Sequence, residues 1–339
     1  MRFGCTGLLG ILMVCGAIPV MPHVCSAQVG TADRAPAVSE DSSLSGPGPT
    51  FVVPAGEIPQ HWNVIAYGDT RFTDPANITA TNPKVRRWLV DRIASEHPDA
   101  LLISGDLPLK GSISADYEVF KHETEPWRTA KLRVYPALGN HELSGDKVVG
   151  LKNWWAAFPE LAGRRWYSVQ FGNAYFIALD SDMDLIAGSQ QRAWLTDQLA
   201  HLPKETQFVM IELHHPPVAD MTPPQTHEVR PNEAALATFL EAQSAKLKAK
   251  IVVIGGHTHN YERFEEEGVV YLVSGGGGAA PYIVPRDAKD LYKNAPAVNY
   301  HYIKFEFDGK TLNATMYRVD GDVDAPAWEA KDWFKIKAP

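Results

Sequence analysis

Short apolar runs alternate with longer amphipathic segments along most of the chain, from Trp62 onward. The short runs are rich in Val, Ile, Leu, Tyr and Phe, which is typical of strands buried inside a sheet. The segments that contain predicted strands are 62–69, 100–106, 133–142, 164–171, 174–181, 207–217, 250–259, 268–278 and 301–321. The predicted helices cover 82–99, 114–127, 189–202 and 232–247, and the aromatic-rich segment 153–160 is predicted to pack as a core or rim helix.

Two turn signals indicate antiparallel pairing between neighbouring strands. Gly172-Asn173 separates two apolar runs, and Asp308-Gly309 divides the last long one. Such dipeptides between apolar runs are typical of β-hairpins. Because strands also alternate with helices elsewhere, the pattern predicts an α/β domain with mixed strand pairing, in the form of a two-sheet sandwich.

The first part of the chain has a different character. Residues 1–27 contain one charge, at Arg2, followed by an apolar stretch and small residues, so they predict a secretory signal peptide cleaved near Ala27. An uncleaved anchor helix and a lipid anchor at Cys15 are alternatives. Residues 28–58 are rich in Pro, Gly, Ser, Ala and Thr and predict a disordered leader, which leaves 59–339 as the folded domain.

Composition narrows the class of protein and its compartment. The formal charge of −8 argues against a surface that binds nucleic acid. All cysteines, at positions 5, 15 and 25, lie in the predicted signal peptide, so the mature chain is expected to contain neither disulfides nor thiolate metal ligands. No later stretch is apolar enough to span a membrane. We therefore expect a secreted or periplasmic protein, free of the membrane after cleavage.

Polar residues with metal-binding potential recur where the predicted strands end. These residues are Asp69, Asp106, Asn140, His141, His214, His215, His257 and His259. Sites in open α/β sheets form in the crevice at the carboxyl ends of strands, so the pattern predicts that these side chains gather there. The donors are oxygens and imidazoles without sulfur, which suits Zn, Mn, Fe, Mg or Co and does not choose among them.

The order of these motifs resembles a known family. The set GD, GD, GNHE, HHP and GHTH, over Asn63 to Ala280, resembles the calcineurin-like metallophosphoesterase superfamily. The stretch GHTHNYER followed by YLVSGGGGA makes the chain most similar to the purple acid phosphatase-like branch. The resemblance implies a four-layer α/β/β/α sandwich of two mixed β-sheets flanked by helices, with two metal ions, each Fe, Zn or Mn.

The resemblance also implies a role for each motif residue. Asp106 would bridge the two ions. The other implied ligands are Asn140, His214 and His257 for one ion, and Asp69 and His259 for the other. His214 is expected rather than His215, because the family ligand stands two residues before the proline, here Pro216. His141 would contact the phosphate and protonate the leaving oxygen, with an Asp or Glu partner orienting it.

Two positions depart from the family pattern. Arg71 stands where the commoner pattern has histidine, and Leu109 stands where the purple branch has a tyrosine ligand. Arginine is permanently protonated and cannot coordinate a cation, so the Asp69 ion lacks one expected ligand. Arg71 is expected to bind the substrate phosphate; the alternative is an ion pair with a neighbouring acid such as Asp74 or Glu142.

The sequence thus predicts an exported metal-dependent phosphoesterase that acts on small-molecule phosphate esters through a hydroxide held by the metals. Phosphomonoesters are the preferred substrates. A phosphodiesterase would use the same metal core, and a phosphate- or ligand-binding relative without strong catalysis is the alternative from another class. The sequence carries no signal for oligomeric state.

Overall fold

The computed structural model describes residues 48–220, 228–293 and 299–339. The predicted signal peptide, residues 1–27, lies outside the described residues, as does the leader from 28 to 47. Within the described ranges, no helix is both long and apolar enough to cross a membrane.

The helices and strands alternate much as the apolar pattern predicts. The helices are α1 (Pro83–Ser95), α2 (Ser114–Glu123), α3 (Glu125–Thr129), α4 (Lys147–Ala157), α5 (Gln190–Ala200) and α6 (Pro231–Ser244), with short 3₁₀ turns η2 (Ala55–Glu57) and η3 (Pro159–Leu161). The strands are β1 (Phe51–Val53), β2 (His61–Tyr67), β3 (Ala100–Ile103), β4 (Val134–Pro136), β5 (Tyr167–Phe171), β6 (Ala174–Ala178), β7 (Phe208–Glu212), β8 (Lys250–Gly255), β9 (Tyr261–Glu266), β10 (Val269–Ser274), β11 (Tyr300–Asp308), β12 (Thr311–Val319) and β13 (Glu329–Lys337).

Local capping fixes where several helices begin. The side chain of Asn82 accepts a hydrogen bond from the Val85 amide, and proline follows at the first position of α1. Asp146 caps α4 in the same way, as does Ser189 for α5. These side chains satisfy amide groups that have no partner within the helix, so each helix begins where the sequence provides a short polar acceptor.

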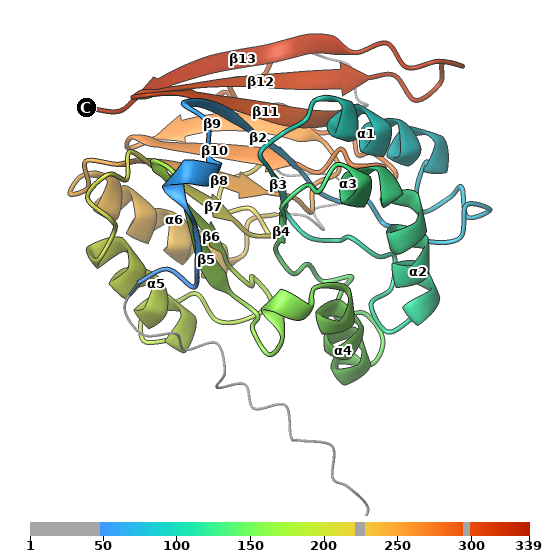
Figure 1. Cartoon of the computed structure of the whole chain (residues 1–339), viewed down its shortest axis with the longest axis horizontal. Helices are drawn as coiled ribbons and strands as arrows, with labels where there is room; N and C mark the ends of the chain where they lie inside the picture. The colour runs from blue at the N-terminus through green and yellow to red at the C-terminus, as the bar shows by residue number, and fades with distance from the viewer. Residues whose placement is uncertain (1–47, 221–227, 294–298) are drawn as a thin grey trace, which may run out of the picture. The chain divides into compact units, whose positions relative to one another are not determined.

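The strands form two mixed sheets that lie against each other (Figure 1). One has seven strands in the order β1-β5-β6-β7-β8-β10-β9, and the other has six in the order β13-β12-β11-β2-β3-β4. The two predicted hairpins are confirmed, because β5 pairs with β6 and β11 with β12 in antiparallel fashion. Strands β2, β3 and β4 are parallel to one another, as are β6, β7 and β8.

Aromatic side chains fill the space between the sheets. Trp62 and Phe307 of the six-stranded sheet stack with ring centroids 3.7 Å apart. Phe171 and Phe208 of the seven-stranded sheet pack against this pair, at 5.0 Å from Trp62 and 5.6 Å from Phe307. Rings of this size remove a large apolar area from water, so the inner faces of the two sheets hold each other in place.

Helices lie against the outer face of each sheet, α5 and α6 on the seven-stranded sheet and α1 and α3 on part of the six-stranded sheet (Figure 1). Residues of α5 and α6 pack on the seven-stranded sheet in one buried cluster that includes Leu195 and Leu240. On the other side, Trp127 of α3 contacts Tyr67 of β2 edge-on and donates a hydrogen bond to the Val90 carbonyl of α1. The observed layers are helices, sheet, sheet and helices, which confirms the four-layer α/β/β/α sandwich.

Three segments differ from the predictions. Residues 51–57, placed in the expected leader, form β1 and η2; β1 pairs with β5, so the folded domain begins before residue 59. The helix predicted at 114–127 divides into α2 and α3, because Pro126 has no amide hydrogen to continue α2. Strands β9 and β13 were not predicted, since charged residues on their exposed positions interrupt the apolar pattern.

One buried histidine makes the stability of the fold depend on pH. His301 of β11 is fully buried; Asn299 O accepts a hydrogen bond from its Nδ1, and Ser274 Oγ lies 3.0 Å from its Nε2. Burial lowers the pKa of His301 to about 4. Between this value and the usual histidine pKa, the unfolded chain binds a proton that the folded chain does not, so stability falls as pH falls through this window.

The variant His301→Gln removes this titrating group. At pH 7 the variant should be less stable than the original chain, but between pH 7 and pH 5 its deficit should shrink by about 2 kcal/mol, because one pKa unit corresponds to about 1.4 kcal/mol. Urea unfolding at the two pH values measures this difference. Parallel stability curves for the two chains would contradict the assigned protonation of His301.

Candidate metal centre

The candidate site lies at the carboxyl ends of strands from both sheets. Asp69, Asp106 and Asn140 follow β2, β3 and β4 of the six-stranded sheet, while His214 and His257 follow β7 and β8 of the seven-stranded sheet. The loops after β2 and β3 stay paired beyond the strands: the Asp69 amide donates to the Gly105 carbonyl, and the Arg71 amide to the Asp106 carbonyl. The site is therefore built on backbone that continues the sheet.

Backbone conformation at the site is unusual. Asp69, Arg71, Asp106 and His257 have φ values of 60°, 47°, 54° and 68°. Side chains with a Cβ rarely adopt this left-handed region, and each such residue costs about 1–3 kcal/mol when the fold holds it there. Of the seven non-glycine residues with positive φ in the described ranges, these four belong to the site.

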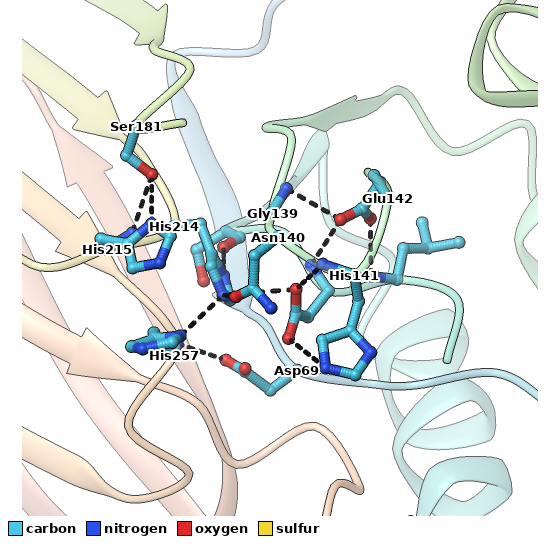
Figure 2. Close-up of polar contacts among 12 residues, drawn as sticks. Asp69, Gly139, Asn140, His141, Glu142, Ser181, His214, His215 and His257 are labelled. Atoms are coloured by element: carbon cyan, nitrogen blue, oxygen red, sulfur yellow. Dashed lines mark hydrogen bonds and ion pairs between the residues drawn. The ribbon is translucent and has the colours of Figure 1, made fainter. Parts of the chain in front are cut away.

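The imidazole of His214 forms the centre of one group of donor atoms. Its Nδ1 lies 2.9 Å from the Ser104 carbonyl oxygen, which accepts a hydrogen bond from it, so Nε2 faces the site. That Nε2 lies 3.0 Å from Asn140 Oδ1, 3.3 Å from Asp106 Oδ1 and 3.2 Å from His257 Nδ1. Figure 2 shows Asn140, His214 and His257 converging on this point.

Asp69 and His259 form the second group. The His257 amide donates to Asp69 Oδ2, which turns Asp69 Oδ1 toward His259 Nε2 at 3.4 Å. His259 Nδ1 donates to the Ala280 carbonyl, so its Nε2 presents a lone pair. Neither Asp69 Oδ1 nor His259 Nε2 has a hydrogen-bond partner among the described residues, and both are buried.

These donor sets fit metal ions. Two buried acceptors facing each other need a cation or a proton between them, because an unpaired buried polar atom costs free energy. Imidazole nitrogens and carboxylate or amide oxygens are ligands for Zn, Mn and Fe. In His214 and His259 one ring nitrogen faces the site while a backbone carbonyl fixes the other. Potential ligand atoms of Asp69, Asp106 and His214 lie within 4.8 Å of one another, as do those of His214, His215 and His257.

Asp106 connects the two groups. It is fully buried, which opposes its ionisation, but nearby His214, His141 and Arg71 outweigh burial and lower the pKa of Asp106. The same carboxylate helps to raise the pKa of His214 against the opposing effect of burial. The carboxylate of Asp106 is therefore the main negative charge around which the site is arranged.

His141 lies beside Asp106 at the rim. Its amide donates to Asp106 Oδ1 at 2.9 Å, its Nδ1 contacts the Leu109 carbonyl oxygen, and its Nε2 lies 3.8 Å from Asp106 Oδ2. The side chain is 20% exposed, so it can reach a bound molecule. Burial lowers the pKa of His141, partly opposed by Asp106. The groups nearest to the two ring nitrogens among these contacts are thus the Leu109 carbonyl oxygen and, at a longer distance, the carboxylate of Asp106.

Arg71 also points at Asp106. Its Nη2 lies 3.3 Å from Asp106 Oδ2, and its Nε is buried without a hydrogen-bond partner among the described residues. The alternative considered for Arg71, an ion pair with a neighbouring acid, is thus present, but the acid is Asp106 and not Asp74 or Glu142. The side chain of Arg71 is 16% exposed, so it is not fully enclosed by the protein.

Glu142 binds the backbone of the loops that carry the site residues. It is fully buried and accepts hydrogen bonds from the amides of Asp106, Leu107 and Gly139, at 3.1, 2.8 and 2.8 Å (Figure 2). Burial, aided by the charge of Asp106, raises the pKa of Glu142. This role was not predicted, although the acidic residue of the GNHE motif was the available signal.

Two further contacts were not predicted. Ser181 Oγ accepts a hydrogen bond from the His215 amide and lies 2.9 Å from its Nδ1, which holds His215 on the side of the site away from His141 (Figure 2). Tyr282 stacks on His259 with ring centroids 4.2 Å apart. No local sequence pattern marks either residue, because both contacts join distant loops.

Comparison with known proteins identifies the family. The family model of the calcineurin-like phosphoesterases matches residues 64–261, more than half of the chain. The chain belongs to this family. The matched range contains every strand end of this calcineurin-like phosphoesterase that contributes to the site, from β2 to β8.

Its relatives include purple acid phosphatases, which confirms the resemblance to that branch. The chain is 24% identical to probable purple acid phosphatase 20 of Arabidopsis thaliana over 58% of this chain and 50% of that protein. The structure of purple acid phosphatase PPD1 from yellow lupin seeds is similar at a TM-score of 0.65, with 16% identity over 83% of this chain and 54% of that one. A dimetal phosphatase from Danio rerio has a TM-score of 0.54, with 13% identity over 82% and 99%.

The chain spans half or less of the length of the curated relatives that it matches.

Close packing at Gly139 gives a test of the site. A Cβ at this position would lie 2.5 Å from the amide nitrogen and the Oδ1 of Asp106, and 3.0 Å from Glu142 Oε2. We expect Gly139→Ala to displace Asp106, lower the unfolding free energy by about 1–3 kcal/mol and weaken metal binding at least about tenfold. Gly56→Ala is the control, since a Cβ there meets nothing within 4 Å. Equal metal affinity in the two variants would contradict this account.

Proposed function

We propose that the chain is a metal-dependent phosphoesterase that hydrolyses small-molecule phosphate esters. The observation that carries the proposal is the set of buried acceptor atoms around Asp106, supplied by strand ends of both sheets. In the proposed assignment, Asp106 bridges two ions, Asn140, His214 and His257 hold one, and Asp69 and His259 hold the other. The likeness of the fold to a dimetal phosphatase is consistent with a binuclear centre.

When bound, the two ions would activate a water molecule for attack on phosphorus and offset the negative charge of the phosphate. The chain supplies the remaining steps. Arg71 binds phosphate oxygens, since its guanidinium is planar, permanently charged and has a buried Nε donor available. The side chains of the site, such as Asp69, Asp106 and His214, are buried and therefore have little freedom to move. In this proposal they hold the ester in one orientation.

His141 delivers the proton to the leaving oxygen. The Leu109 carbonyl holds Nδ1, which leaves Nε2, 3.8 Å from Asp106 Oδ2, to carry the proton. Because burial lowers the pKa of His141, the protonated ring releases that proton more readily than an exposed histidine does.

A phosphomonoester is the preferred substrate in this proposal, and the similarity to purple acid phosphatases supports that choice. Export through the N-terminal segment is also part of the proposal.

Metal analysis of the purified chain tests the centre and the activity together. Near two ions per chain, with hydrolysis of a chromogenic phosphomonoester after addition of Mn or Zn, is the expected result. His214→Ala should lose bound metal and turnover by about a hundredfold, because a ligand of the centre is missing. His215→Ala should lose less metal than His214→Ala, since Ser181 Oγ lies 2.9 Å from His215 Nδ1, whereas His214 Nε2 lies among the donor atoms of Asn140 and Asp106.

Failure to bind metal, with no turnover of monoester or diester, would refute the proposal. In that case the chain would be a phosphate- or ligand-binding relative. Faster turnover of the diester than of the monoester would replace the phosphatase assignment with that of a phosphodiesterase.

The proposed role of Arg71 has a separate test. Arg71→Ala should raise KM for the phosphomonoester about tenfold or more, because a hydrogen bond to a charged group contributes about 1.5–3 kcal/mol. Arg71→Lys keeps the positive charge but not the planar guanidinium, so its KM should lie between those of the original chain and Arg71→Ala. Arg133→Ala, which removes a surface partner of Glu57, is the control. An unchanged KM in Arg71→Ala would contradict phosphate binding by Arg71.

A further inference from the structure

Three buried carboxyl groups surround a junction between distant segments of the chain. Asp220 lies after β7, Glu262 lies on β9, and Asp290 lies in the loop after β10. The Asp220 amide donates a hydrogen bond to Glu262 Oε2 at 2.5 Å, and the Asp287 amide donates one to Asp220 Oδ1 at 3.1 Å. Asp220 thus joins its own segment to β9 and to the loop after β10.

Two carboxyl oxygens of this junction are left without a hydrogen bond. Asp220 Oδ2 and Glu262 Oε1 are both buried, and neither has a partner among the described residues. An ionised carboxylate with an unpaired oxygen is unfavourable inside a protein, whereas a protonated carboxyl group is neutral and can donate a hydrogen bond. The geometry therefore favours at least one bound proton at the junction.

The guanidinium of Arg286 pairs with the third carboxyl group. Its Nη1 donates to Asp290 Oδ2 at 2.8 Å, and its Nη2 donates to Asn260 Oδ1 at 3.0 Å. Within the described part of the chain, none of the hydrogen bonds or ion pairs of Arg286 reaches the side chain of Asp220 or Glu262. One positive charge therefore serves three carboxyl groups, and it is held by Asp290.

The other charged groups beside the junction have partners of their own. On β9, the Arg263 Nε donates to Asp332 at 2.6 Å, and Glu266 forms an ion pair with Lys289 at 3.0 Å. The exposed carboxylate of Asp287 accepts a hydrogen bond from the Lys289 amide at 2.8 Å. These groups supply no further positive charge to the two unpaired oxygens.

The protonation of the junction follows from this environment. Burial, together with the negative charge of Asp290, raises the pKa of Asp220 to about 7, and burial raises the pKa of Glu262. The usual pKa of these side chains is about 4, so between about pH 4 and pH 7 the folded chain holds a proton that the unfolded chain has released. A cavity of about 570 Å³, lined in part by Asp220, Arg286 and Asp287, adjoins the junction, so this proton can exchange with solvent.

We propose that Asp220 and Glu262 form a proton-dependent clamp, which joins the segment after β7 to β9 and to the loop after β10 in acid and weakens as the pH rises. When the proton leaves, two buried carboxylates have unpaired oxygens at the same junction. The clamped segments follow His214 and His259 in the sequence, so the clamp ties together chain from both groups of the candidate metal centre. The stabilisation is fully present in acid and is lost as the pH rises toward and past about 7.

The variant Asp220→Asn keeps the shape of a protonated aspartic acid but cannot ionise. Urea unfolding of the purified chain at pH 5, 6, 7 and 8 gives the folding equilibrium constant of the variant relative to the original chain. We expect this ratio to rise about tenfold per pH unit between pH 5 and pH 7, because the original chain releases one proton on unfolding and the variant does not. Glu262→Gln should shift the ratio in the same direction. Parallel stability curves for both variants and the original chain would overturn the inference.

Glu233→Gln is the matched control. Glu233 of α6 is also fully buried, but both of its oxygens have partners, with Arg230 Nε 2.8 Å from Oε2 and Asn232 Nδ2 3.1 Å from Oε1. This variant should be less stable than the original chain by a similar factor at each pH, because the carboxylate that it removes is ionised throughout. A rise with pH as steep as that of Asp220→Asn would overturn the assignment of the effect to the junction.

Hydrogen exchange shows where the effect is located. At pH 8, amides of β9 and of residues 285–292 should exchange more slowly in Asp220→Asn than in the original chain, because the clamp of the original chain has lost its proton. At pH 5 the two chains should exchange alike. Equal exchange in these segments at both pH values would overturn the clamp.

A bound cation is the alternative occupant of the unpaired oxygens. We expect calcium chloride at pH 8 to change the stability of the original chain and of Asp220→Asn equally. Selective stabilisation of the original chain by calcium would show that a cation joins the carboxyl groups in place of a proton, and would overturn the inference. These experiments measure folding and use no phosphate ester, so their outcome does not depend on the proposed function.

Discussion

The convergence of buried acceptor atoms on one carboxylate is the constraint on which this site depends. Asp106 comes from the six-stranded sheet, yet its nearest histidine, His214, comes from the seven-stranded one. A buried carboxylate is unfavourable without positive charge nearby, and Arg71 supplies only part of it. The electrostatics of the centre and the packing of the two sheets are therefore not independent, because a shift of one sheet against the other would separate Asp106 from its partners.

The rest of the fold keeps these atoms in place. Aromatic rings such as Trp62 and Phe307 hold the sheets together, and backbone pairing extends the loops after β2 and β3 beyond the strands. Glu142 binds three amides of the same loops, so the turn that carries Asn140 and His141 cannot move separately from Asp106. Rigid support of this kind is needed if the donor atoms are to be in position before a metal ion binds.

The sequence alone predicted the residues whose position depends on local structure. Strand ends such as those at Asp69 and His257 are marked by apolar runs followed by glycine, and the structure brings these side chains together. The stacking of Tyr282 on His259 could not be predicted, because it depends on how a loop after β10 folds back over a segment that precedes that strand. Strand β1 was missed for the same reason, since it is stabilised by pairing with β5, far along the chain. Local patterns thus located the donors, whereas the groups that orient them required the tertiary structure.

The left-handed backbone at Asp69, Arg71, Asp106 and His257 has an evolutionary consequence. Glycine adopts this conformation without steric cost, so replacement by glycine would relieve backbone strain at each of these positions while deleting a side chain that faces the site. Selection for stability and selection for the site therefore act in opposite directions there. A descendant of this chain released from its function would be free to accumulate glycine or asparagine first at these four positions, ahead of the well-packed core.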